Sequence, residues 1–242
     1  MLDATASAAD IVTALVEAGD PFRAAGSRRF FKTGPGEYAE GDEFVGIRVP
    51  ELRKLARGMR GLPGGVLADL VATPLHEARQ LALLTLGVNF AAARGSDRAH
   101  WVDVYRDAVR SGHVDNWDLV DCSAESILGA FLVDADDYSE LLDWASSDNL
   151  WERRVGIIGA FSFIRAGRAD AILAVAPLVI DDRRDLIQKA FGWMLRETGK
   201  RVDRAVLTDY LDAHAARMGR TALSYAAEHL ASDERSRYRA MR

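Results

Sequence analysis

Apolar and polar residues alternate with the period of an α-helix along nearly the whole chain. Alternating runs of Val, Ile and Thr, which are typical of strands, are absent. The pattern therefore predicts an all-α protein in which short connections make neighbouring helices antiparallel. Helices are predicted near residues 8–18, 21–31, 50–59, 64–72, 75–93, 98–111, 116–132, 137–146, 149–165, 169–180, 184–198, 203–217 and 220–231.

Four of these helical stretches resemble one another and recur at regular distances. They read EARQLALLTLG from residue 77, NWDLVDCSAESILG from 116, WERRVGIIGAF from 151 and LIQKAFGWMLR from 186. A spacing of roughly 35–40 residues is the period of a two-helix HEAT-type repeat. The fold class predicted is an all-α, HEAT-like helical repeat solenoid, an α-α superhelix with a concave binding face. Residues 1–242 are expected to form a single domain of this kind.

The composition is that of a soluble globular protein, with 49% hydrophobic and 28% charged residues. No apolar run reaches the roughly 18 residues that span a bilayer, and the first residues do not resemble a secretion signal. The single cysteine, Cys122, excludes an internal disulfide and fits a reducing compartment. We therefore expect a cytoplasmic protein with no membrane partner, and we expect it to be a monomer.

The histidines do not form a metal-binding pattern. The five of them lie far apart in the sequence, with no pair at ligand spacing and no cysteine cluster beside them. Residues 32–50, here called the acidic segment, are rich in glycine and proline but follow no strand and carry four carboxylates. That composition argues against a phosphate-binding loop. No metal and no cofactor are predicted.

Charge is spread unevenly along the chain. The net charge of −5 argues against a nucleic-acid partner, since phosphate binding draws on clustered Lys and Arg. Residues 183–204, however, hold seven basic and three acidic side chains. Such a run has two interpretations, an ordinary solvated helix face or a surface that binds an anionic partner.

Three of the four similar helices place an aromatic and a charged side chain on one face. The pairs are Trp117 with Asp121, Trp151 with Arg154, and Lys189 with Trp193. A charge on an apolar stripe needs a partner or solvent. One interpretation is an internal ion pair of Asp121 with Arg154, covered by tryptophans. The other is a cleft with aromatic walls and one carboxylate, which suits a cationic or sugar-like group attached to a phosphate chain.

The sequence resembles the AlkD-like family of DNA alkylation repair proteins, which are DNA glycosylases built from HEAT-like repeats. The resemblance extends from FFKTGPGEYAEGDEFVGIRVPELR through NWDLVD and WERR to IQKAFGWMLRE. The most specific parts are NWDLVD, the W-x-x-R of Trp151 to Arg154, and QKAFGW. Their order and spacing together carry the match.

The resemblance implies a function and a set of residues. The family removes cationic alkylpurines such as N3-methyladenine and N7-methylguanine from double-stranded DNA, without a metal or cofactor and without flipping the base. By this resemblance the catalytic residues are Asp121, Trp117 and Trp193, and Arg154 binds phosphate. Further DNA-binding candidates are Trp151, Lys189, Arg153 and Arg196. The alternatives are a HEAT-repeat protein that binds DNA structures without catalysis, and a scaffold for a protein partner.

Overall fold

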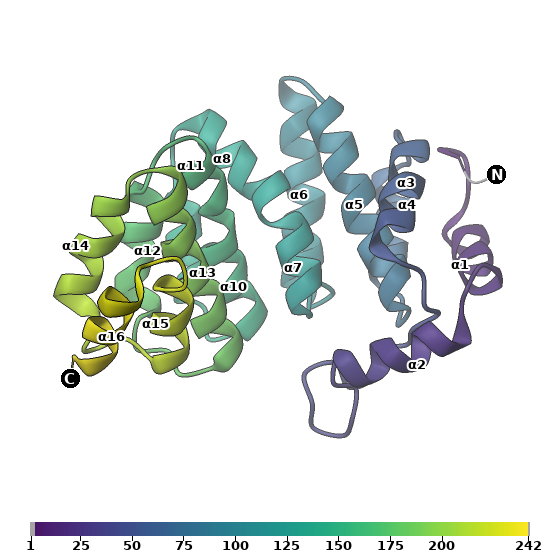
Figure 1. Ribbon diagram of the computed structural model, residues 1–242. Coiled ribbons are helices and arrows are strands. Elements are labelled where there is room, and N and C mark those ends of the chain that lie inside the picture. The colour runs from purple at the N-terminus through teal and green to yellow at the C-terminus, as the bar shows by residue number, and fades with distance from the viewer. Residues whose placement is uncertain (1–2, 242) are drawn as a thin grey trace. The chain divides into compact units, whose positions relative to one another are not determined.

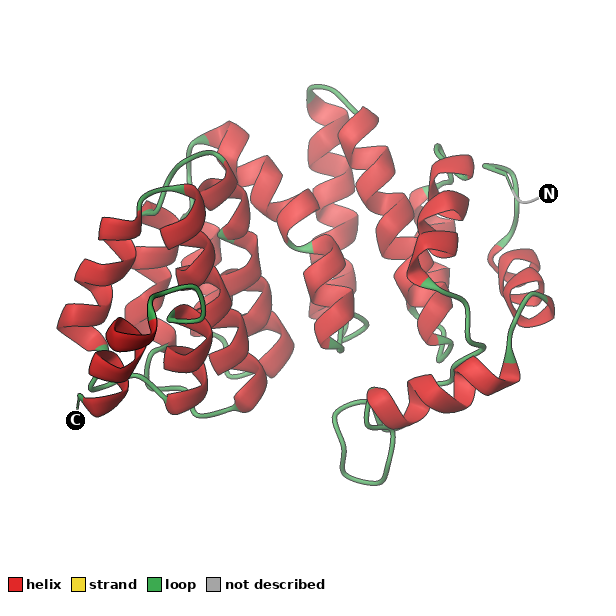
Figure 2. Ribbon diagram, in the orientation of Figure 1, coloured by secondary structure: helices red, strands yellow, loops and turns green. Residues whose placement is uncertain are grey.

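The chain is helical throughout the part described in this computed structural model, residues 3–241 (Figure 1, Figure 2). The first half contains α1 (Ala8–Glu17), α2 (Pro21–Phe30), α3 (Val49–Gly58), α4 (Gly64–Val71), α5 (His76–Ala92), α6 (Ser96–Arg110) and α7 (Trp117–Ser123). The second half contains a π-helical turn, η1 (Glu125–Gly129), and α8 (Ala130–Ala135), α9 (Ser139–Ser146), α10 (Leu150–Gly159), α11 (Phe161–Arg165), α12 (Asp170–Val179), α13 (Asp185–Arg201), α14 (Arg204–His214), α15 (Arg220–Ala226) and α16 (Ser232–Ala240). Residues 3–241 contain no β-strand, only an isolated bridge between Glu43 and Leu75.

The predicted helices are present, with three differences. The helix predicted over 116–132 is divided into α7, η1 and α8, and the one over 149–165 ends at Gly159 and resumes as α11. Helix α16 was not predicted, because Tyr238 is its one buried side chain and its sequence therefore shows no apolar period. Local caps fix several starts. Asp20 accepts from two backbone N–H groups of α2, and Asn149 does the same for α10.

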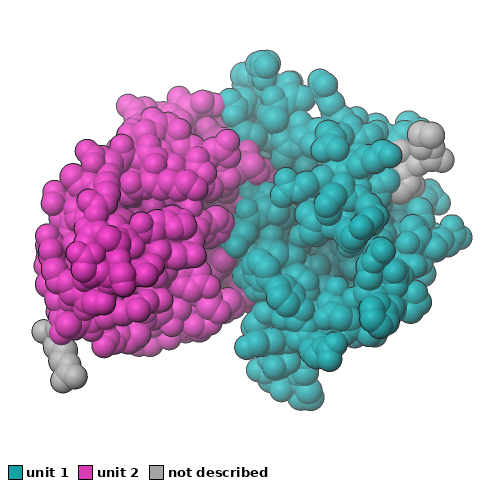
Figure 3. Space-filling view, in the orientation of Figure 1, with its two compact units in different colours: residues 1–123 teal, residues 124–242 magenta. Residues whose placement is uncertain are grey.

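The chain forms two compact units, unit 1 (residues 1–123) and unit 2 (residues 124–242), drawn in different colours in Figure 3. In unit 1, α5 packs against α3 and α7 as well as against α4 and α6. In unit 2, α10, α13 and α15 follow one another in one layer, while α9 contacts α10 and α12 contacts α9 and α13. Neighbouring helices therefore pack pairwise in each unit, and the predicted all-helical repeat fold is confirmed.

Small residues allow the closest helix contacts in unit 2. A Cβ added at Gly192 of α13 would lie 2.3 Å from the carbonyl oxygen of Ala222 in α15. A Cβ at Gly156 of α10 would lie 2.5 Å from the backbone nitrogen of Ala145 in α9. Both distances are below van der Waals contact, so a larger residue at either position would force the two helices apart.

None of the helices described within residues 3–241 is both long enough and apolar enough to cross a membrane.

Candidate active site

Helix α7 presents Trp117 and Asp121 from the same side. Its buried face consists of Leu119, Val120 and Ser123, which pack into unit 1. Trp117 and Asp121 are one turn apart and both are half-buried. The aromatic and acidic pair predicted from the sequence is therefore partly accessible to a ligand, and the apolar side of the same helix anchors it.

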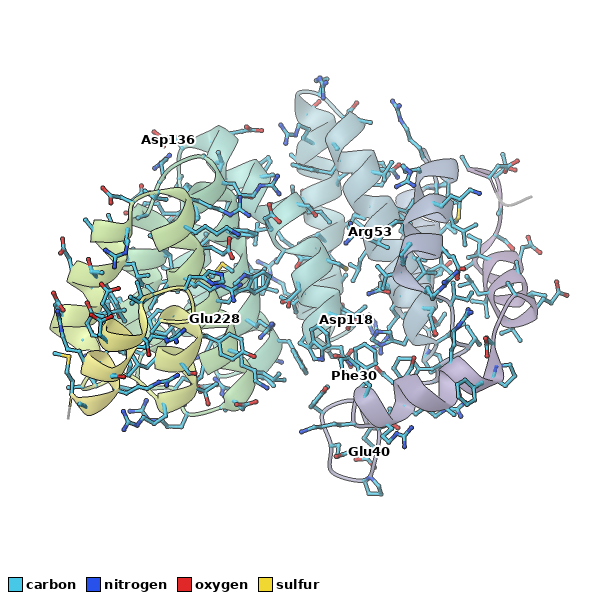
Figure 4. The ribbon with its side chains drawn as sticks, in the orientation of Figure 1. Phe30, Glu40, Arg53, Asp118, Asp136 and Glu228 are labelled. Carbon is cyan, nitrogen blue, oxygen red and sulfur yellow. The ribbon has the colours of Figure 1, made fainter. Side chains whose placement is uncertain are left out.

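Trp117 is held by residues that precede it by about eighty positions in the chain. Its ring stacks on Phe31, with centroids 5.5 Å apart and planes at 21°. Phe30, at the end of α2, meets it edge-on at 5.9 Å, and Figure 4 labels this residue near Asp118 of α7. The indole Nε1–H donates a hydrogen bond of 3.3 Å to the hydroxyl of Tyr38. Both the plane and the edge of the indole are therefore fixed by residues 30–38.

A buried ionic network lies behind this aromatic cluster. The imidazole of His76, at the start of α5, stacks under Phe44 and is only 2% exposed. Its Nδ1 is 3.0 Å from Oδ2 of Asp42, and its Nε2 is 2.8 Å from Oδ2 of Asp118. Ionised carboxylates only accept hydrogen bonds, so both ring nitrogens must carry a proton for both contacts to be made. The geometry therefore describes an imidazolium between two carboxylates.

The electrostatics of the network agree with this geometry. Burial of the imidazole works against its charge, but the hydrogen bonds to Asp118 and Asp42 outweigh burial and raise the pKa of His76 to about 9. Burial likewise opposes the charge of Asp42, and the contacts with His76 and Arg79 outweigh it and lower the pKa of that carboxyl. His76 is therefore positively charged at neutral pH.

Further donors complete the network around the two carboxylates. Arg79, one turn along α5 and 4% exposed, bridges Asp42 and Asp115. The side-chain amide of Gln80 donates to Asp118 at 2.9 Å, and that of Asn116 to Asp42 at 3.3 Å. This charged cluster is largely buried and largely paired, so it belongs to the architecture of unit 1.

In unit 2, the predicted phosphate-binding arginine is buried. Arg154 on α10 is 4% exposed, and its Nη1 donates to the backbone carbonyl of Leu186 at the start of α13. Its neighbour Arg153 donates from Nε to the carbonyl of Ser147 at 2.8 Å and pairs with Asp182 at 3.3 Å. Both guanidinium groups therefore connect helix ends within unit 2.

Helix α13 carries the other predicted residues. Trp193 is half-buried, with its ring 5.8 Å from that of Phe161. Lys189 pairs with Asp185 at 2.7 Å, one turn earlier on the same helix. Arg196 pairs with Glu228 and with Glu197. Trp151 lies in the first turn of α10 and is also half-buried.

Comparison with known proteins assigns the chain to a family. The family model described as DNA alkylation repair enzyme matches residues 11–230. The chain belongs to this family. Among solved structures, one described as a predicted DNA alkylation repair enzyme from Enterococcus faecalis superposes with a TM-score of 0.67 at 17% identity. The match covers 88% of this chain and 97% of that one, and it shows a shared fold. No curated protein matches the chain.

In this member of the DNA alkylation repair family, the predicted residues fall into two groups. Trp117 and Asp121 lie together on α7 of unit 1. The six others lie in unit 2, on α10 (Trp151, Arg153, Arg154) and α13 (Lys189, Trp193, Arg196). Helices α10 and α13 contact each other, so these six side chains come from one pair of packed helices.

Sequence reasoning missed the residues that hold Trp117. The sequence pattern assigned no role to four residues in and behind this aromatic cluster: Phe31, Tyr38, Asp42 and His76. The signal available was the Asp42 carboxylate in an irregular segment and a histidine at the start of an apolar helix. The structural role of each residue follows only from the hydrogen bond between them, which joins positions 34 residues apart in the chain.

The described residues show no evident metal-binding site. In residues 3–241 no group of three or more His, Cys, Asp or Glu side chains is arranged to hold a metal ion. His76 directs both ring nitrogens at carboxylates, which leaves it no lone pair for a ligand bond. Burial raises the pKa of the Cys122 thiol, which disfavours the thiolate that metal binding needs.

Proposed function

We propose that the protein is a DNA glycosylase that excises positively charged N3- and N7-alkylated purines from duplex DNA by hydrolysis of the N-glycosidic bond. In this proposal it needs no metal or cofactor and does not flip the base. Membership of the DNA alkylation repair enzyme family supports the class of function. The observation that carries the specific reaction is the half-buried Asp121, one turn from an indole that other residues hold in a fixed orientation.

The residue types suit the chemistry of these lesions. Alkylation at a ring nitrogen makes the purine a cationic leaving group, so cleavage of the C1′–N bond needs little general acid. The electron pair of that bond leaves with the base, and the sugar becomes oxocarbenium-like. A carboxylate beside this sugar stabilises the developing positive charge and can orient the attacking water, whose proton is released as the C1′–O bond forms. We assign this role to Asp121.

Trp117 would hold the deoxyribose next to Asp121. The face of an indole attracts a cation within about 6 Å of its centroid, and the attraction grows as positive charge develops on the sugar. Stacking on Phe31 and the hydrogen bond to Tyr38 fix the ring before substrate arrives. A fixed ring loses little conformational entropy when the sugar binds, so this arrangement favours catalysis.

The residues of unit 2 are proposed to bind the sugar–phosphate backbone of the DNA. In the proposal Trp193 also holds deoxyribose, Arg154 contacts phosphate, and Lys189 and Arg196 give up internal ion pairs to phosphate. Trp151 and Arg153, at the start of α10, are assigned to the same backbone contacts. The Lys189–Asp185 pair is exposed, and exposed pairs contribute little to stability, so exchanging that carboxylate for a phosphate costs little. We further propose that both units act as one domain of residues 1–242 that works as a monomer.

The test is Asp121→Asn, which keeps the shape of the side chain and removes its charge. Because only stabilisation that grows in the transition state is lost, single-turnover release of N7-methylguanine should slow by roughly 10²-fold or more. Binding to a duplex with a non-cleavable lesion should change little or tighten. Asp69→Asn, at an exposed position of α4, is the matched control and should excise at the wild-type rate.

Two outcomes would count against the proposal. Release at the wild-type rate by Asp121→Asn would show that this carboxylate is not catalytic. A wild-type protein that binds methylated duplex and releases no base would favour a DNA-structure-binding protein without glycosylase activity.

A further inference from the structure

The acidic segment (residues 32–50), together with Phe31 directly before it, connects α2 to α3 and is attached to the start of α5 by several bonds. The backbone N–H of His76 donates to the carbonyl of Glu43 at 2.8 Å, and Glu43 donates to the carbonyl of Pro74 at 2.9 Å. The buried carboxylate of Glu77 accepts from the backbone N–H of Gly46 at 2.7 Å. These contacts hold the segment in one conformation over the first turn of α5.

Gly46 shows how closely this segment is packed. Its φ is +87°, in the region that favours glycine, and a Cβ there would lie 2.3 Å from the carbonyl oxygen of Asp20. The segment therefore passes directly against the start of α2, with no room for a side chain. Its path is fixed at this end by backbone contact.

The other end of the acidic segment contacts α7. Phe31 stacks on Trp117, and Tyr38 accepts the indole N–H. His76 joins the same two elements through side chains, since Asp42 belongs to the segment and Asp118 follows Trp117 directly in α7. Segment and helix are therefore connected through the indole and through the imidazolium, and Arg79 and Asn116 add contacts between Asp42 and the residues just before α7.

We propose that His76 is a positioning residue: its imidazolium ties the acidic segment to α7 and thereby fixes the orientation of Trp117 beside Asp121. For its catalytic consequence the inference rests on the proposed glycosylase function, whereas the orientation of Trp117 can be measured without it. A neutral imidazole carries one proton, so on deprotonation it can donate to Asp42 or to Asp118 but not to both. One of these two hydrogen bonds is then lost, and the repulsion between the two carboxylates is no longer offset by the imidazolium, so the link between the acidic segment and α7 weakens and Trp117 can shift.

Charged groups of the neighbouring elements lie around His76. They are Asp42 and Glu43 of the acidic segment, Asp115 and Asp118 at α7, Glu77 and Arg79 on α5, and Arg28 of α2, which donates to the carbonyl of Phe44. Both groups that are hydrogen-bonded to the ring are carboxylates, and His76 loses its proton only as the pH rises through about 9. The bridge is therefore intact at neutral pH and opens on the alkaline side.

The orientation of Trp117 can be followed by ¹⁹F NMR of protein labelled with 5-fluorotryptophan. The chain has five tryptophans, and Trp117→Phe assigns the relevant signal. In the wild type this signal should shift between pH 7 and 10 with a midpoint near 9. In His76→Gln it should already be displaced at pH 7 and should show no such midpoint. His100→Gln, a change of an exposed histidine on α6, is the matched control and should behave as the wild type.

A second variant covers the case in which His76→Gln does not fold. Tyr38 accepts the indole hydrogen bond, and a tyrosine ordinarily loses its proton near pH 10, so Tyr38→Phe removes a titratable group that contacts the indole directly. A midpoint near 9 that persists in Tyr38→Phe supports the proposal. Its loss in Tyr38→Phe, its persistence in His76→Gln, or a wild-type signal that does not titrate overturns the proposal.

Base release measures the catalytic consequence separately. At pH 7.5, His76→Gln should slow single-turnover excision by about tenfold or more, because a small displacement of a positioned group is costly. Its affinity for lesion duplex should stay within about threefold of the wild type, since the change lies behind the indole. Equal excision rates, with a displaced Trp117 signal, would overturn the catalytic role. If the wild type releases no base, the glycosylase proposal fails, and the NMR titration still decides whether His76 positions Trp117.

Discussion

Arg154 shows how one residue can support two hypotheses. Its place on an apolar stripe predicted either a phosphate contact or a structural partner for a carboxylate. In the structure the guanidinium is 4% exposed and donates to the carbonyl of Leu186. A charged donor in so buried a position supports the packing of α10 on α13.

Arg154→Ala should therefore lower the stability of unit 2. Loss of a charge-assisted hydrogen bond at a buried site costs about 2–3 kcal/mol, which lowers Tm by roughly 4–12 °C in a chain of this size. Thermal unfolding measures this effect. Arg165→Ala is the control, because that side chain is 60% exposed in its ion pair with Glu125 and should cost little. A Tm loss no greater than the control, together with weaker DNA binding, would assign Arg154 to phosphate alone.

At the scale of helices, individual glycines determine where two helices can pack closely against each other. Gly192 lies inside α13 where α15 leaves no space for a Cβ, whereas Gly26 lies inside α2 with no atom within 4 Å of the same position. Both glycines lie inside a helix, but Gly192 is closely packed and Gly26 has open space beside it. Alanine substitutions at the two positions therefore distinguish the intrinsic helix preference of alanine from the effect of packing.

Alanine substitutions at these two glycines should change stability in opposite directions. Gly26→Ala should stabilise the protein by about 0.5–1 kcal/mol, because alanine favours the helix and meets nothing. Gly192→Ala should destabilise it by about 1–3 kcal/mol, because the new methyl group overlaps the carbonyl of Ala222. Denaturant unfolding of both variants provides the comparison. Stabilisation by Gly192→Ala would contradict the close packing of α13 on α15.

At the scale of the whole molecule, the acidic net charge does not describe the surface that is proposed to bind DNA. The chain carries −5 overall, but residues 183–204 are predominantly basic. Association with duplex DNA depends on local phosphate contacts, each of which releases counterions.

Affinity for duplex DNA should consequently fall steeply with salt. Each phosphate contact contributes about −0.9 to the slope of log K against log salt concentration, so a protein with several contacts shows a slope of several units. Lys200→Ala, at an exposed position of α13, should reduce the slope by about one. Fluorescence anisotropy across a salt series measures both. Binding that is insensitive to salt, or absent at low salt, would favour the protein-scaffold alternative.

The single-domain prediction also belongs to this scale. Residues 1–123 and 124–242 are each compact, and the single-domain prediction requires that the two units unfold together, as coupled neighbours in a helical repeat do. Calorimetry should therefore show one transition, which Gly192→Ala shifts as a whole. Two transitions, of which the substitution moves only the one that belongs to unit 2, would show that the units are separate domains.

The sequence by itself determined the secondary structure, the repeat and the family. Apolar residues at helical spacing identify which face of each segment is buried, and this depends only on neighbours three or four positions away. The same local rule put Trp117 and Asp121 on one side of α7. It failed for α16, whose few buried atoms leave no apolar period, and it could not see the π-helical turn that divides residues 116–132.

Only the tertiary structure decided what surrounds these side chains. The imidazolium of His76 between Asp42 and Asp118, and the support of Trp117 by Phe31 and Tyr38, join residues 34–86 positions apart. Local spacing carries no information about such contacts, because they exist only after α2, α5 and α7 have packed. Burial then gives them their effect, since a charge removed from water requires a partner in a defined geometry.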